Sequence, residues 1–238
     1  MDYLQGLNPE QRGAVEQING PVMIVAGAGS GKTRVITYRV AHLIRSGVDA
    51  FNILVLTFTN KAAKEMRERI NNLVGPDAKN IWMGPFTSVF AQILRVEADK
   101  IGYPNNFTIY DTDDSKSVLR AIIKEMNLDD KLYNVNFVLN RISAAKNNLV
   151  SWMEYQQNPQ IQADDIETRR NQLGVIYQNY VARCYRAGAM HFDDLLYKSK
   201  VLLKKHPQVL NKYQHKFKYL MVDEYKDTNF SQYLIVKK

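Results

Sequence analysis

The sequence has one cysteine, Cys184, in 238 residues, and this scarcity excludes a framework of internal disulfide bonds. A lone thiol is most simply interpreted as a small, buried apolar residue in a reducing compartment. No apolar run approaches the ~20 residues that a membrane-spanning helix needs, and the first residues lack the basic-then-apolar pattern of a signal peptide. These absences predict a cytoplasmic protein without a membrane segment.

Internal repeats, low-complexity tracts and Cys/His clusters with metal-ligand spacing are also missing from the sequence. Charge, in contrast, is unbalanced, because 32 Lys and Arg against 24 Asp and Glu leave a formal net charge of +8. This charge favours a polyanionic partner, but nucleic acids, acidic membranes and acidic proteins all satisfy it. The length allows one large domain or two small ones, and we favour two.

A glycine-rich run, AGAGSGKT, directly follows the apolar segment 22–25. Its glycines let successive backbone N–H groups point at phosphate oxygens, which a Cβ atom would hinder. Lys32 is predicted to reach the β- and γ-phosphates of ATP, and Thr33 to offer a hydroxyl to Mg²⁺. A plain turn between strand and helix is the alternative, but it leaves the Lys-Thr pair unexplained. The predicted nucleotide-binding residues here are Ala26, Gly27, Ala28, Gly29, Ser30, Gly31, Lys32, Thr33 and Arg34.

Short apolar runs alternate with helical patterns, which is typical of a parallel sheet in an α/β protein. The predicted strands are 22–26, 53–58, 81–83 and 219–222. The predicted helices between them are 33–45, 61–73 with Asn60 as its cap, and 88–100.

Helical periodicity dominates from about residue 102 to 188, in the stretches 113–126, 136–146 and 164–186, and no convincing buried strand is apparent there. Turn-forming residues flank this region at 104–106 and 187–189. We therefore predict a domain of two segments, 1–104 and 188–238, interrupted by a helical insertion at 105–187.

The apolar run 219–222 ends in two carboxylates, Asp223 and Glu224. Strands of a parallel sheet bring their carboxyl ends to one edge, where ligands bind. Asp223 is then predicted to hold Mg²⁺, and Glu224 to polarise the water that attacks the γ-phosphate. The alternative is that the acidic pair only caps the next turn.

Four segments resemble, in the same order, motifs of the UvrD/Rep-type superfamily 1 DNA helicases. LNPEQ at 7–11 is similar to the Q motif, AGAGSGKT to the phosphate loop, LTFTNKAAKEM at 56–66 to motif Ia, and MVDEYKDTN at 221–229 to motif II. Weaker matches occur at 84–95 and 191–196. A nucleoside or other small-molecule kinase, the alternative from another class, would share the phosphate loop but not motif Ia or the motif II ending.

The resemblance implies a RecA-like P-loop NTPase sheet with helices on both faces, subdomain 1A, interrupted by an all-helical subdomain 1B. It implies that Gln11 reads adenine and that Arg39 lies over the base. It also implies a single-stranded DNA contact along motif Ia and the next strand end, although Phe58 alone would be interpreted as core. The implied DNA-binding residues are Thr57, Phe58, Thr59, Asn60, Lys61, Thr87 and Ser88. Seven lysines between residues 198 and 218 form either a solvated face or a further DNA contact.

The sequence departs from the family pattern at Lys226, Thr87 and Pro85, where Gln, His and Thr are usual. The family's motif III and its second motor domain, with the arginine finger, lie beyond the sequence. The resemblance therefore implies the N-terminal part of an ATP-dependent 3′–5′ DNA helicase of repair or replication, acting on single-stranded DNA or a single-strand/duplex junction. A subunit of a helicase–nuclease complex and a module that binds ATP and DNA without turnover are the alternatives.

Overall fold

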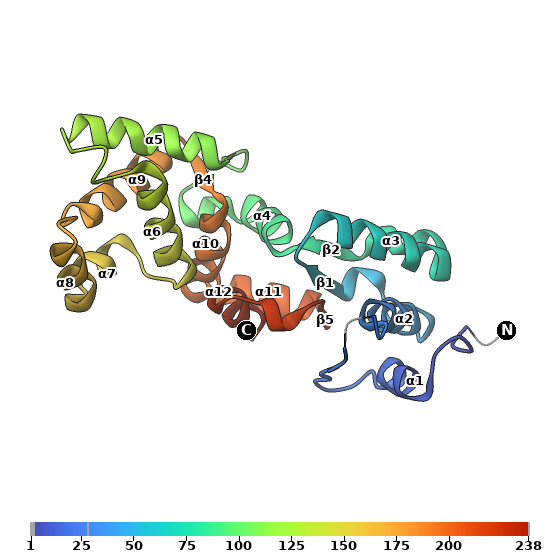
Figure 1. The fold of residues 1–238 in the computed structure, drawn as a ribbon. Coiled ribbons are helices and arrows are strands. Elements are labelled where there is room, and N and C mark those ends of the chain that lie inside the picture. The colour runs from blue at the N-terminus through green and yellow to red at the C-terminus, as the bar shows by residue number, and fades with distance from the viewer. Residues whose placement is uncertain (1–2, 28, 238) are drawn as a thin grey trace. The chain divides into compact units, whose positions relative to one another are not determined.

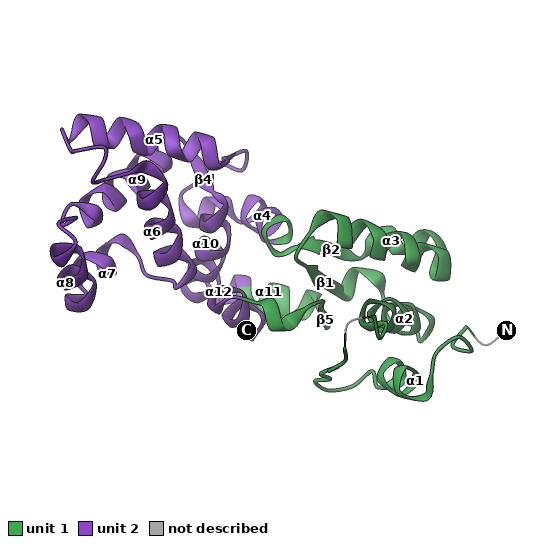
Figure 2. Ribbon diagram, viewed as in Figure 1, with its two compact units in different colours: residues 1–89, 210–228 green, residues 90–209, 229–238 purple. Residues whose placement is uncertain are grey.

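The computed structural model describes residues 3–27 and 29–237, and these divide into two compact units (Figure 2). Unit 1 comprises residues 1–89 and 210–228, and unit 2 comprises residues 90–209 and 229–238. Residues 90–104, 188–209 and 229–237 therefore pack with the helical unit, whereas the sequence analysis groups them with the sheet. The subdomain boundaries at 105 and 187 stay a prediction about the family.

Unit 1 carries a three-stranded sheet and the helices that cover it (Figure 1). Its elements are α1 (Pro9–Glu16), α2 (Lys32–Arg45), η1 (Ala50–Asn52), β1 (Ile53–Thr57), α3 (Asn60–Val74), η2 (Gly75–Asn80), β2 (Trp82–Pro85), the start of α4 (Phe86–Val96), the end of α11 (Pro207–Lys216), β5 (Tyr219–Val222) and η4 (Tyr225–Asp227).

The sheet has the strand order β2-β1-β5 and is parallel throughout, with Leu56 of β1 opposite Gly84 on one side and Val222 on the other. All five residues of β1 are buried, as expected for a central strand of a parallel sheet. Val55 packs in one cluster with residues of α2 and α3, while Leu54 and Leu56 alternate to the opposite face and are buried too. The α/β fold with a parallel sheet is thus confirmed.

The predicted strand at 22–26 is wrong. Residues 21–27 adopt no regular structure, and the side chain of Val25 is 89% exposed. An apolar run becomes a strand only where a neighbour completes its backbone hydrogen bonds. Among the described residues no strand pairs with this segment, and β5 is an edge strand of the sheet.

Helices α2 and α3 agree with the predicted 33–45 and 61–73 within one residue at either end. The predicted cap of α3 is wrong, because Thr59 and not Asn60 accepts the hydrogen bond from the N–H of Ala62, at 3.1 Å. Arg67 on α3 does not simply face water, since its guanidinium donates to three backbone carbonyls between residues 78 and 83. α3 is thereby tied to the start of β2.

Unit 2 is mostly helical. Its elements are the rest of α4, η3 (Ala98–Ile101), β3 (Thr108–Tyr110), α5 (Thr112–Glu125), α6 (Val135–Asn147), α7 (Trp152–Gln157), α8 (Pro159–Glu167), α9 (Leu173–Arg186), β4 (Ala189–His191), α10 (Phe192–Lys205) and α12 (Phe230–Val236).

Two features of unit 2 differ from the sequence analysis. The short strand β3 was not expected, and it pairs in parallel with β4, with Ile109 opposite Met190. The predicted helix 164–186 is two helices, α8 and α9, because the chain turns through Arg169, whose φ of 57° is left-handed. Periodicity alone does not reveal such a break, since the apolar spacing continues on both sides of the turn.

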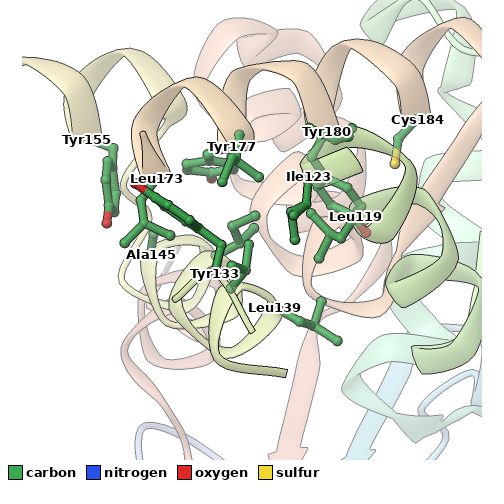
Figure 3. Close-up of a cluster of buried hydrophobic side chains, with 14 residues drawn as sticks. Leu119, Ile123, Tyr133, Leu139, Ala145, Tyr155, Leu173, Tyr177, Tyr180 and Cys184 are labelled. Atoms are coloured by element: carbon green, nitrogen blue, oxygen red, sulfur yellow. The ribbon is translucent and has the colours of Figure 1, made fainter. Parts of the chain in front are cut away.

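The core of unit 2 combines aliphatic side chains with four buried tyrosines, Tyr133, Tyr155, Tyr177 and Tyr180 (Figure 3). Tyr177 and Tyr180 of α9 are almost completely buried among leucine and isoleucine side chains of α5 and α6. Cys184 is buried at the end of this cluster, which confirms the expected role of a small apolar residue, and burial raises the pKa of its thiol to about 11.

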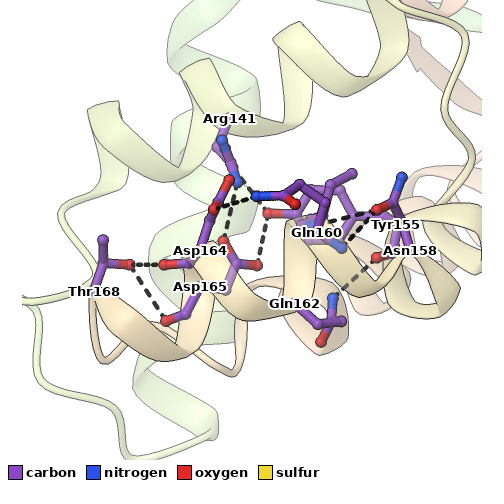
Figure 4. A network of polar contacts seen from close by, with 9 residues as sticks. Arg141, Tyr155, Asn158, Gln160, Gln162, Asp164, Asp165 and Thr168 are labelled. Carbon is purple, nitrogen blue, oxygen red and sulfur yellow. Dashed lines mark hydrogen bonds and ion pairs between the residues drawn. The ribbon is translucent and has the colours of Figure 1, made fainter.

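Two buried carboxylates fix the helices of unit 2. Asp165 of α8 accepts a hydrogen bond from the Tyr155 hydroxyl at 2.8 Å and lies 3.2 Å from the Arg141 guanidinium (Figure 4), although burial still raises the pKa of this carboxyl. Asp194 of α10 lies 2.8 Å from the ammonium of Lys146 on α6, and both side chains are nearly inaccessible to solvent.

None of the helices in the described part of the chain has the length and apolar composition of a membrane span.

Candidate nucleotide and nucleic-acid site

The glycine-rich loop has the backbone conformation that its sequence requires. Gly29 and Gly31 have φ values of 75° and 87°, in the left-handed region where a Cβ atom causes strain. Gly31 is the N-cap of α2, so the free N–H groups of the first helical turn and the helix dipole point toward the loop. Ala28, also predicted to bind nucleotide, lies outside the described residues.

The loop's own carbonyl groups hold the ammonium of Lys32. Its Nζ lies 2.9 Å from the Ala26 oxygen and 3.0 Å from the Gly27 oxygen. The Ser30 hydroxyl donates to the same Gly27 oxygen at 2.7 Å. These contacts are exposed to solvent, so an incoming phosphate can replace the carbonyl oxygens around Lys32.

Asp223 lies at the carboxyl end of β5 and is buried. Burial and the neighbouring Glu224 raise the pKa of its carboxyl, while the Glu224 N–H and the charge of Lys32 act in the opposite direction. The electrostatic influence of Lys32 indicates that the loop and the end of β5 face one region. Thr33, half-buried in the first turn of α2, adds a hydroxyl, and a hydroxyl with one carboxylate suits Mg²⁺ held together with phosphate.

Glu224 precedes η4 as its N-cap residue and has a strained conformation. Its φ of 51° lies in the left-handed region, which is uncommon for residues other than glycine. Its carboxylate lies 3.8 Å from the ammonium of Lys226, and both side chains are largely exposed. The lysine that replaces the family's glutamine thus pairs with the predicted base, in a contact that solvent weakens.

Gln11 lies beside the loop, but both ends of its side-chain amide have protein partners. Its oxygen accepts from the Asn8 N–H at 3.2 Å within the capping box of α1, and its Nε2 donates to the Ser30 oxygen at 3.0 Å. Adenine must therefore replace the Ser30 contact if Gln11 is to read the base.

Arg39 is buried, and its guanidinium donates to the Ala14 oxygen at 2.7 Å. Burial lowers the pKa of this group. The side chain also borders a hollow of about 400 Å³, lined by residues 18–21, Leu43 and residues 218–221. Arg34 is exposed, with its guanidinium 5.4 Å from the centroid of the Tyr38 ring. The sequence alone could not reveal the hydrogen bond from Arg39 to the backbone of α1.

Motif Ia leaves the sheet at the carboxyl end of β1. Thr57 is buried and donates to the Thr59 oxygen at 3.1 Å. Phe58 is 37% exposed, with its ring 5.7 Å from that of Phe86, so it is not a fully buried core residue. The next residues, Asn60 and Lys61, are exposed at the start of α3.

Thr87 and Ser88 occupy the first turn of α4 and are half-buried. The register sets Thr57 opposite Pro85, so α4 begins at the same edge of the sheet as motif Ia. β5 also ends at this edge, with Asp223 donating its N–H to the Leu56 oxygen at 3.0 Å. The carboxyl ends of three predicted strands thus meet as expected, whereas the fourth strand is absent.

Residues 191–196, one of the weaker motif matches, and Lys198 of the basic stretch both have partners within unit 2. His191 lies 3.0 Å from the carboxylate of Asp193, and Asp194 accepts the N–H of His191, so this segment caps α10. Burial lowers the pKa of Lys198, which lies 5.5 Å from the Tyr103 ring in unit 2. No group of three His, Cys, Asp or Glu residues suited to a metal occurs among the described residues.

Comparisons with known proteins agree with the motifs. A profile of the family described as "UvrD/REP helicase N-terminal domain" matches residues 7–238. The chain is 43% identical over 236 residues to ATP-dependent DNA helicase PcrA of Bacillus subtilis (strain 168). The aligned region covers 99% of this chain and 31% of that relative. Proteins of the same name from Staphylococcus epidermidis and Staphylococcus aureus are each 43% identical to this chain over 235 residues. These alignments cover 98% of this chain and 31% of each relative. The chain therefore spans 31% of the length of these relatives.

Proposed function

This chain belongs to the UvrD/Rep helicase family and corresponds to its N-terminal domain, and on this premise we propose that it binds MgATP and single-stranded DNA as part of a 3′–5′ DNA helicase. The direction of movement and the junction substrate come from the family resemblance. The proposed pathway is DNA repair or replication.

One observation carries the proposal. Asp223 follows β5 and donates its N–H to the Leu56 oxygen at 3.0 Å, where motif Ia leaves β1, and Lys32 of the phosphate loop is near enough for its charge to favour the ionised Asp223 carboxyl, which counteracts the rise of its pKa. A cation that attracts phosphate, a carboxylate that holds a metal, and an exposed aromatic segment thus share the ligand-binding edge of a parallel sheet. A turn that merely joined two elements would not require this convergence.

The proposed roles in nucleotide binding follow from the positions of the side chains. Lys32 leaves the carbonyls of its loop for the phosphates, with the loop N–H groups around it. Thr33 and Asp223 hold Mg²⁺, which neutralises phosphate charge when it is bound. Glu224 accepts a proton from the attacking water, and Gln11 contacts adenine after releasing Ser30.

The proposed DNA contact runs along the same edge. Phe58 presents an exposed ring for stacking on a base, while Asn60 and Lys61 offer an amide and an ammonium to phosphates. Thr87 and Ser88 add hydroxyl groups at the start of α4. Thr57 and Thr59 act less directly, since Thr57 is buried and Thr59 caps α3.

The chain by itself is expected to bind nucleotide and hydrolyse it barely above background. Hydrolysis in this class needs a cation at the γ-phosphate, and such an arginine contributes about 10³–10⁵ in rate. The family takes it from a second motor domain. Lys226 is a poor substitute, because its ammonium lies 3.8 Å from the Glu224 carboxylate and so pairs with a group of this chain.

The test is steady-state ATP hydrolysis and nucleotide binding, with and without a single-stranded oligonucleotide, using Lys32→Ala as the inactive control. Binding of both ligands with very slow turnover supports the proposal. Strand displacement by this chain would contradict the need for a second motor domain. Phosphorylation of a small-molecule acceptor would identify a kinase, and nucleotide binding without any DNA binding would remove the helicase assignment from motif Ia.

A further inference from the structure

Aromatic side chains gather where the three strands of unit 1 begin, at the end of the sheet opposite the nucleotide site. Trp82 is the first residue of β2, and its ring lies 5.2 Å from that of Phe217, edge to face. The Tyr213 ring stacks on Phe217 at 5.9 Å. Because Phe217 lies between the end of α11 and the start of β5, this cluster joins two strand beginnings.

Lysines lie on these rings. The ammonium of Lys216 is 3.8 Å from the centroid of the Trp82 ring and 5.3 Å from that of Phe217. Lys212, one helical turn earlier, lies 5.3 Å from the Tyr213 ring. The backbone oxygen of Lys216 accepts a hydrogen bond from the Asn52 side chain at 2.8 Å, which anchors it beside the start of β1. Asn52 thus fixes the backbone of Lys216, and the ammonium lies over the Trp82 ring at a distance typical of a cation–π contact.

The electrostatic surroundings of this edge are basic. Among the described residues no carboxylate lies within 4.0 Å of Lys216 or of the exposed Lys218. Burial and then the charge of Lys212 lower the pKa of Lys216. Asp49 lies in the turn before η1, and its carboxylate accepts a hydrogen bond from the N–H of Phe51 at 2.9 Å. Nearby positive charges repel each other, and a bound polyanion relieves that repulsion.

We propose that Lys212, Lys216 and Lys218 form a second nucleic-acid contact. This contact holds the phosphate backbone of DNA at the end of the sheet where the three strands begin. This contact is distinct from motif Ia, because β1 has five residues and separates the two edges by about 17 Å. Lysines 212 and 216 lie on one side of α11, at the i, i+4 spacing that suits a polymer of regularly spaced charges.

The arrangement favours phosphate over base recognition. Lys216 already covers the face of Trp82, so the ring orients a cation and does not offer itself to a base. The contact should then show little sequence preference and a strong dependence on salt. The inference rests on the proposed function only in that DNA is already bound at motif Ia.

The test compares Lys212→Gln/Lys216→Gln with Lys124→Gln/Lys131→Gln, a control that removes two exposed lysines from unit 2. Affinity for a labelled oligonucleotide is measured by anisotropy over a range of salt concentrations. Loss of two phosphate contacts is expected to reduce the slope of log K against log salt by about 1.4 for a single strand. The control should leave the slope unchanged.

Two further variants separate the possible causes. Lys218→Glu alters one exposed charge without disturbing the rings, and it should weaken binding even if the double variant is poorly folded. Phe58→Ala reports on motif Ia. Weakening by Phe58→Ala with unchanged slopes for both lysine variants would overturn the second contact and leave the proposed function intact, whereas absence of any DNA binding by the unaltered protein would overturn both. Displacement of DNA by polyglutamate of equal charge would indicate an acidic protein as the partner and would also overturn the inference.

Discussion

Replacement of Lys32 by alanine should weaken MgATP binding by about 1–3 kcal/mol, or roughly 5- to 150-fold in Kd. An ammonium aimed at phosphate in a partly desolvated site is worth about 2–5 kcal/mol. Lys32 must first release the oxygens of Ala26 and Gly27, at 2.9 and 3.0 Å, and each such exposed contact offsets about 0.5–1 kcal/mol of that gain. The net loss is therefore smaller than the full value of a charged phosphate contact.

The assay is titration calorimetry with a slowly hydrolysed ATP analogue and Mg²⁺. Lys64→Ala is the matched control, since Lys64 is an exposed lysine of α3 outside the site. The thermal midpoint should change little in either variant, because water replaces the ammonium at the two exposed carbonyl groups. An affinity within twofold of the unaltered protein for Lys32→Ala would refute the assignment of Lys32 to the phosphates.

Three other variants test the remaining assignments. Glu224→Gln should keep MgATP affinity, because the amide retains the shape of the carboxylate. In a protein that carries the second motor domain, it should lower DNA-stimulated turnover at least ~10²-fold. Loss of MgATP binding would indicate that Glu224 is a metal ligand instead. Asp223→Asn should raise the thermal midpoint of the nucleotide-free protein at neutral pH, since the raised pKa of Asp223 means that its ionised form destabilises the fold. That cost disappears in the unaltered protein as pH falls through the raised pKa, so the two midpoints should converge in acid, and a lower midpoint for the variant at neutral pH would contradict the reasoning. Lys146→Met should reduce the free energy of unfolding by about 3–5 kcal/mol in urea, because the buried Asp194 carboxylate loses its ion pair and keeps only weaker partners such as the His191 N–H; a loss below ~1 kcal/mol would show that solvent reaches the pair.

The sequence by itself determined the chemistry that we propose for the site. The phosphate loop is recognisable because glycines, a lysine and a hydroxyl must follow one another within a few residues to surround a phosphate. The same is true of the acidic pair after β5, since an apolar strand that ends in carboxylates is a local pattern. Helices α2 and α3 were predicted within one residue because their apolar spacing and their ends lie in the same short segment.

Only the tertiary structure decided which of these side chains have other partners. Arg39 donates to a carbonyl of α1, 25 residues away, and Gln11 reaches Ser30 across 19 residues. The predicted strand at 22–26 failed for the same reason, because a strand depends on hydrogen bonds from another segment that its own residues do not specify. The lysine of the basic stretch that lies on Trp82 could not be distinguished from its neighbours either, since Asn52, which anchors it, is 164 residues earlier. Local patterns record the chemistry that adjacent residues perform together, whereas packing between distant segments determines which groups are already occupied.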